Sequence, residues 1–194
     1  MKKYIAFTAF LIGLSFFSKA QLTDPEIHAL KGGRVKPDSS YIYALPFSPK
    51  SKFLLIQAYN SKMSHAGELS LDFKMKQGSK ICAARDGMVE SIKEDSDKGG
   101  LKSEFMNDGN HIVIRHSDGS MAMYWHLKKE GVIVKQGDNV LKGQHIGYSG
   151  NTGYTAFPHL HFQVQDANGR DIATRFYTRK GVKYLRPGKW YKAL

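Results

Sequence analysis

The sequence predicts a single all-β domain built mainly from one antiparallel sheet. From residue 41 onward, short alternating or apolar runs are separated by Gly, Asn, Asp and Pro, which is the pattern of strands joined by turns. A sustained helical period is missing from the same region. A chain of 194 residues is long enough for one domain with its own core but short for two.

The first twenty residues have the features of an export signal. Two lysines precede an apolar run at 4–17, and Ser18-Lys19-Ala20 places small residues where a signal peptidase cuts. A membrane anchor is the alternative, but this run is shorter than the roughly twenty residues that a spanning helix needs. We expect cleavage near Ala20-Gln21, an exported protein in the periplasm or outside the cell, and no stable membrane insertion of the mature chain.

The rest of the chain divides into a polar lead-in, 21–40, and a folded domain, 41–194. The last 25 residues carry eight Arg or Lys against one Asp, which favours a closing hairpin with a basic outer face over a substrate-binding patch. Removing the three lysines of the predicted signal lowers the net charge from +12 to +9. This excess of positive charge favours acidic cell-envelope polymers as partners over nucleic acid, because no basic-aromatic recognition motif is present.

Cys82 is the only cysteine, so an internal disulfide is excluded and a packed thiol is expected.

Two predicted strands place polar side chains opposite an apolar face. In residues 68–75, odd positions are apolar and Asp72 belongs to the polar face. In residues 121–127, odd positions are again apolar, so we expect them to face the core and Tyr124 to share the opposite face with His126.

A third predicted strand, 159–165, carries two histidines on one face. His159 and His161 alternate with apolar residues, so both imidazoles leave the same side of the strand. Their Cα atoms are then about 6.5–7 Å apart, which suits one metal ligand and one catalytic partner better than two ligands. A lone His-x-His is weak evidence, since two solvent-facing histidines would give the same pattern.

Further motifs on both sides of this strand strengthen the interpretation. They are Ser64-His65-Ala66-Gly67, 71–73, 83–89, 110–119, Tyr124-Trp125-His126-Leu127, 134–138, 142–147, Ser149-Gly150-Asn151-Thr152-Gly153 and Pro158-His159-Leu160-His161-Phe162. These segments resemble the lysostaphin-type, or LytM-like, zinc peptidases that cut peptide bonds in peptidoglycan. The similarity covers about 100 residues in the family's order.

The resemblance implies a fold, a metal site and an activity. The fold would be the lysostaphin/LytM type, a duplicated hybrid of barrel-sandwich-like form. Zn²⁺ would be bound by His65, Asp72 and His161, while His126 and His159 would be catalytic. Two histidines and one aspartate satisfy a catalytic zinc site, which keeps a position for water and lowers the pKa of that water from 15.7 to about 7. We expect a monomer that hydrolyses peptidoglycan.

The sequence departs from the family at two places. Six residues separate His65 from Asp72, where His-x-x-x-Asp is commonest, so Glu68 is an alternative ligand to His65. Residues 155–157, Thr-Ala-Phe, replace the usual small residues before Pro158, and this bulkier rim would narrow the substrate groove.

Two other functions compete with the endopeptidase. A non-catalytic LytM-like domain that binds the wall or regulates an amidase would have the same fold, but such relatives generally lose metal ligands and this chain keeps every candidate. A barrel-sandwich carrier module is the third possible function. The sequence does not have the lysine in a tight turn to which such a module attaches its cargo. The remaining histidines, His28, His111, His116 and His145, are expected to be structural or solvent-exposed.

Overall fold

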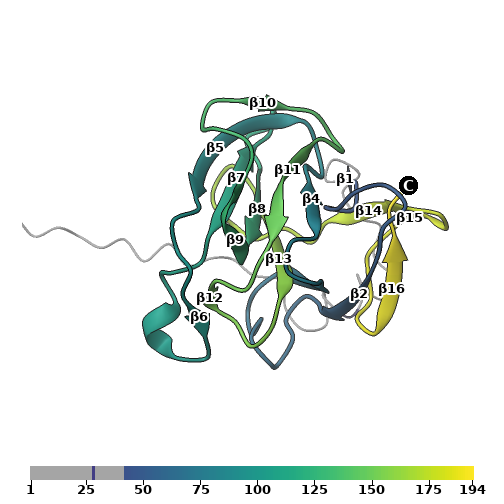
Figure 1. Ribbon diagram of the computed structural model, residues 1–194. Coiled ribbons are helices and arrows are strands. Elements are labelled where there is room, and N and C mark those ends of the chain that lie inside the picture. Colours follow the sequence, from purple (N-terminus) through teal and green to yellow (C-terminus); the bar gives the residue numbers. More distant parts are fainter. Residues whose placement is uncertain (1–27, 29–41) are drawn as a thin grey trace, which may run out of the picture.

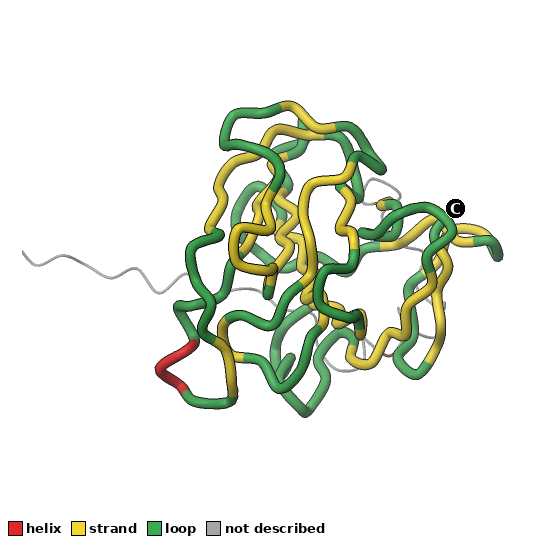
Figure 2. The backbone as a smooth tube through the Cα atoms, in the orientation of Figure 1, coloured by secondary structure: helices red, strands yellow, loops and turns green. Residues whose placement is uncertain are grey.

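A computed structural model describes residue 28 and residues 42–194, and its elements are nearly all β-strands (Figure 1). The predicted export signal, 1–20, and nearly all of the lead-in, 21–40, lie outside the described residues, so both stay predictions. A three-residue 3₁₀ helix, η1 (Ser103–Phe105), is the short red segment of Figure 2. Over the described residues, no helix has the length and apolar character to cross a bilayer. The predicted all-β class is confirmed.

Eight strands form one large antiparallel sheet that carries the candidate site. In spatial order they are β10 (Asn139–Val140), β5 (Gly87–Lys93), β7 (His111–Arg115), β8 (Met121–Trp125), β13 (His159–Gln165), β3 (Ser70–Lys74), β2 (Lys52–Gln57) and β16 (Lys189–Lys192). Strand β13 therefore lies between β8 and β3, although β3 and β13 are far apart in the sequence.

Three small sheets complete the described fold. They are β4 (Lys80–Cys82), β11 (His145–Ser149) and β9 (Leu127–Val132); β1 (Ile42–Tyr43), β14 (Arg175–Thr178) and β15 (Gly181–Lys183); and β12 (Gly153–Tyr154) with β6 (Gly99–Gly100). The pairs β1–β14 and β12–β6 are parallel, which the antiparallel prediction did not include. Within the basic C-terminal segment, β14 and β15 form a hairpin, whereas β16 pairs with β2 at the edge of the large sheet.

One face of the large sheet is apolar and packs into the core. Leu160 and Phe162 on β13 are buried, as the two-residue period of this strand predicts. Tyr124 on β8 is also buried, and its hydroxyl accepts a hydrogen bond from the backbone N–H of Ala84, 2.8 Å away. This bond ties the large sheet to the segment that follows β4. Cys82 is buried and free, as expected.

The predicted core face of residues 121–127 is wrong. Ala122 and Tyr124 are fully buried, while the odd residues of β8, Met121, Met123 and Trp125, are half-buried on the opposite face. Both faces of this strand carry large or apolar side chains, so the period alone does not distinguish them. His126 has a positive φ of 64° and ends the alternation, and Leu127 is consequently buried although it is odd-numbered.

Candidate metal centre and active site

The candidate site lies on the polar face of the large sheet, where neighbouring strands align polar side chains. Asp72 on β3 is paired with His161 on β13 and with Gln57 on β2. His161 is paired on its other side with Trp125 on β8. Directly opposed residues of an antiparallel pair share a face, with Cβ atoms about 4.5–5.5 Å apart. The register therefore places these four side chains in one row across four strands.

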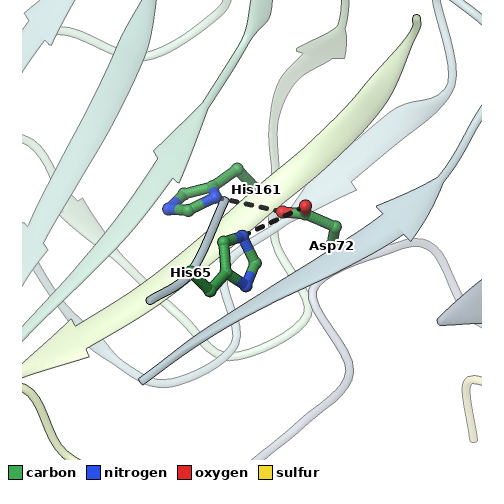
Figure 3. A group of neighbouring side chains, drawn as sticks. All are labelled: His65, Asp72 and His161. Atoms are coloured by element: carbon green, nitrogen blue, oxygen red, sulfur yellow. Dashed lines mark hydrogen bonds and ion pairs between the residues drawn. The ribbon is translucent and has the colours of Figure 1, made fainter. Parts of the chain in front are cut away.

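The three predicted metal ligands form a compact group (Figure 3). Nε2 of His65 lies 3.1 Å from Oδ2 of Asp72, and Nδ1 of His161 lies 3.0 Å from Oδ1 of the same carboxylate. One donor atom from each residue falls within 4.8 Å of the others. Figure 3 shows the two imidazoles facing the carboxylate from separate segments of the chain.

The electrostatics of this group favour a cation. Burial of Asp72 opposes its ionisation, but the adjacent imidazoles of His161 and His65 outweigh this effect and lower the pKa of the carboxyl. The side-chain amide of Gln57 also donates a hydrogen bond to Oδ2 of Asp72, at 2.9 Å. Asp72 is therefore a carboxylate at neutral pH, and its oxygens are held in place.

The donor set of the group fits zinc. Nε2 of His65 is buried and forms no hydrogen bond within the described part of the chain, despite its closeness to Asp72. Leaving such an atom unsatisfied typically costs about 1–3 kcal/mol. A metal ion bound by this nitrogen, by a carboxylate oxygen and by a nitrogen of His161 would remove that cost. Two imidazoles and one carboxylate are a known ligand set of catalytic zinc, and this set leaves one position open.

The long spacing before the aspartate is accommodated by the loop between β2 and β3. The amide of Gln57 donates a second hydrogen bond, to Oγ of Ser64 at 2.6 Å, and so holds the segment that bears His65 beside the carboxylate. Glu68 instead accepts a hydrogen bond from the hydroxyl of Ser70 at 3.2 Å and is not part of the three-residue group. The geometry thus favours His65 over Glu68 as the ligand.

The two predicted catalytic histidines lie beside the group with defined tautomers. Nδ1 of His159 is 2.8 Å from the carbonyl oxygen of Phe157, and Nδ1 of His126 is 2.7 Å from that of Thr152. A carbonyl oxygen only accepts, so both Nδ1 atoms carry the proton and both Nε2 atoms carry the lone pair. Nε2 of His159 is 3.7 Å from Oδ1 of Asp72, and the rings of His126 and His159 are 4.6 Å apart between centroids.

Burial keeps these two imidazoles uncharged. Burial, followed by the neighbouring imidazoles of His159 and His161, lowers the pKa of His126 to about 3. Burial also lowers the pKa of His159, although the carboxylate of Asp72 opposes this shift. Both side chains are therefore neutral at pH 7, and each ring has an unprotonated Nε2.

Sequence reasoning did not assign three further residues their contacts at the site. Gln57 is a single amide at the end of an apolar strand, and its role depends on pairing with β3. Trp125 lines the groove and its ring centroid is 4.2 Å from that of His111; its position directly before His126 in the matched motif was the available signal. Oγ1 of Thr155 lies 3.2 Å from Nδ1 of His159, and nothing in the sequence indicated this contact.

The other histidines lie outside the group. His111, His116 and His145 each have one ring nitrogen within 3.2 Å of a backbone carbonyl oxygen, which agrees with a structural role. His28 is exposed.

The site opens into a groove with a volume of about 640 Å³. The five predicted site residues line it together with residues 154–157. Phe157 is 38% exposed and its ring centroid is 5.6 Å from that of His159, so the bulky segment does form part of the groove wall beside the site. The exposed apolar side chains of Met63, Leu101 and Tyr154 also contribute to the wall.

Comparison with known proteins identifies the family. The sequence model described as Peptidase family M23 matches residues 65–174, which is more than half of the chain. The chain belongs to peptidase family M23. The predicted resemblance to lysostaphin-type peptidases is confirmed, and the matched segment contains all five predicted site residues.

Several M23 peptidases are similar to this chain over part of their length. The peptidoglycan DD-endopeptidase ShyA of Vibrio cholerae is 37% identical over 93 residues, which cover 48% of this chain and 19% of ShyA. Lysostaphin of Staphylococcus simulans is 40% identical over 94 residues, which cover 48% of this chain and 17% of lysostaphin. The chain thus matches about a fifth of the length of these relatives.

The solved structure of pseudoalterin, an M23 metalloprotease from the deep sea, supports the fold assignment. It is 18% identical to this chain, has a TM-score of 0.53 and covers 80% of this chain and 96% of its own. At this identity the similarity concerns the fold alone.

Proposed function

We propose that this protein is a zinc-dependent endopeptidase that hydrolyses peptide bonds of peptidoglycan, in crosslinks or stem peptides. The observation that carries the proposal is the convergence, in one groove, of a His-Asp-His group and two uncharged histidines. We also propose that the protein acts in the periplasm or outside the cell, after cleavage near Gln21.

The five site residues divide into two chemical roles. His65, Asp72 and His161 would hold the metal. When bound, zinc is a Lewis acid that activates water and polarises the peptide carbonyl. His159 and His126 present unprotonated Nε2 atoms beside that position, so they would accept the proton of the attacking water and return it to the leaving amine. Their Nδ1 bonds to backbone carbonyls fix each ring in the required tautomer.

The substrate class is supported by the relatives and by the charge of the chain. ShyA is named a peptidoglycan DD-endopeptidase, and the relative ALE-1 of Staphylococcus capitis, 39% identical over 96 residues, is named a glycyl-glycine endopeptidase. These names specify different bonds, so the proposal extends to the polymer and not to one bond. The net charge of +12 for the whole chain, or +9 after the proposed cleavage, suits an acidic cell-wall polymer.

The alternative is a non-catalytic LytM-like domain that binds the wall or regulates an amidase. Such a domain needs neither a buried ring nitrogen that lacks a hydrogen bond nor two histidines held in one tautomer. The groove has both features, which is why we favour the enzyme.

Digestion of purified peptidoglycan tests the proposal. The zinc-loaded protein is incubated with peptidoglycan, and the soluble fragments are identified by mass. We expect fragments that end at cleaved peptide bonds, their loss after treatment with a chelator, and their return when zinc is added. Binding to peptidoglycan without release of fragments would instead support the non-catalytic domain.

A further inference from the structure

The groove has one lysine or arginine among its described lining residues, and it is Lys74. Lys74 is exposed at the end of β3, two residues after Asp72, so both side chains leave the same face of the strand. This spacing places the two Cα atoms about 6.5–7 Å apart. Lys74 is also the cross-strand partner of His159. A fixed positive charge therefore lies directly beside the candidate catalytic centre.

The ammonium group of Lys74 has no carboxylate partner within residues 42–194. None of the ion pairs between these residues includes it, and its Nζ lies over the ring of Phe157, 5.7 Å from the centroid. The aromatic face attracts the cation and holds it at the rim of the groove. The charge is thus positioned by the fold and left available to a ligand.

The described lining of the groove also contains one carboxylate besides that of Asp72, and it belongs to Glu68. Glu68 lines the groove four residues before Asp72, whereas Lys74 follows Asp72 by two residues. A carboxylate on a bound peptide is attracted at the Lys74 side and repelled at the Glu68 side. The groove therefore favours a bound peptide that places a carboxylate at Lys74 and not at Glu68.

We propose that Lys74 is a specificity residue that binds a carboxylate of the substrate, on the side of the scissile bond that runs past His159 and Phe157. This inference rests on the proposed endopeptidase function. It adds that the preferred substrate carries a free carboxylate close to the cleaved bond, and that a neutral carboxamide there is a poorer substrate.

A matched pair of substrates tests the assignment. Crosslinked muropeptides with free carboxylates are divided, and one half is converted to carboxamides with carbodiimide and ammonia. Values of kcat and KM are measured on both halves for the zinc-loaded wild type, Lys74→Gln and Lys74→Arg. Lys76→Gln is the control, because Lys76 is exposed on the same segment but does not line the groove.

We expect the wild type to prefer the free carboxylate by about two- to fivefold in kcat/KM, mainly through KM, which is the range of an exposed ion pair. Lys74→Gln should lose this preference because it becomes slower only on the substrate with free carboxylates. Lys74→Arg and Lys76→Gln should keep the preference. An unchanged preference in Lys74→Gln would overturn the inference and leave the proposed function intact. If none of the proteins cut either substrate, the proposed function itself would fail, and this inference with it.

Discussion

Replacing Gln57 by leucine should weaken zinc binding without unfolding the protein. Gln57 is buried, and its amide donates one hydrogen bond to Oδ2 of Asp72 at 2.9 Å and another to Oγ of Ser64 at 2.6 Å. It therefore orients the carboxylate and also holds the loop that carries His65. Leucine has a similar size but donates no hydrogen bond, so both supports are lost together.

The size of the effect follows from the bond to the carboxylate. A hydrogen bond to a charged group contributes about 1.5–3 kcal/mol, and each 1.4 kcal/mol corresponds to a factor of ten in affinity. We therefore expect the Kd for zinc to rise about 10- to 100-fold in Gln57→Leu, the usual cost of losing a group that orients a metal ligand.

Competition with a chromogenic chelator measures this Kd, and circular dichroism reports whether the variant is folded. Gln163→Leu is the matched control, since Gln163 lines the same groove on β13, two residues from His161. Its zinc affinity should stay close to that of the wild type. A folded Gln57→Leu protein that binds zinc as tightly as the control would refute the supporting role of Gln57.

Three further predictions address other parts of the account. His65→Ala should abolish tight zinc binding while Glu68→Gln leaves it largely intact, as measured by metal content after dialysis; the opposite result would transfer the ligand role to Glu68. Tyr124→Phe should lower the free energy of unfolding by about 1–3 kcal/mol in denaturant titrations, because it leaves a buried backbone N–H without an acceptor, and an unchanged stability would contradict this. Mass analysis of the exported protein should find an N-terminus near Gln21, and an intact Met1 would disprove cleavage.

The sequence predicted the parts of the site that depend on local alternation. In residues 159–165 polar and apolar side chains alternate strictly, so the shared face of His159 and His161 followed directly and the structure has the same arrangement. Residues 121–127 are apolar on both faces, and the same reasoning chose the wrong one. The entry of His126 into the groove depends on its positive φ, which no local pattern indicated.

The remaining features depend on contacts between distant segments. Asp72 and His161 are 89 positions apart, and only the pairing of β3 with β13 brings them together. Their proximity was expected from the family resemblance and not from the residues alone. The roles of Gln57 and Lys74 depend on the same register, because each is a strand residue whose polar group becomes significant only beside Asp72.

The most direct test of the account compares zinc content and peptide hydrolysis in His161→Ala and His159→Ala. The wild type should bind about one zinc ion per chain. His161→Ala removes a ligand and should lose both the zinc and the activity. His159→Ala should keep nearly full zinc occupancy and slow hydrolysis by about 100- to 10,000-fold, the usual cost of losing a general acid or base. A folded His159→Ala that loses its zinc while His161→Ala keeps it would contradict the assignment of ligand and catalyst.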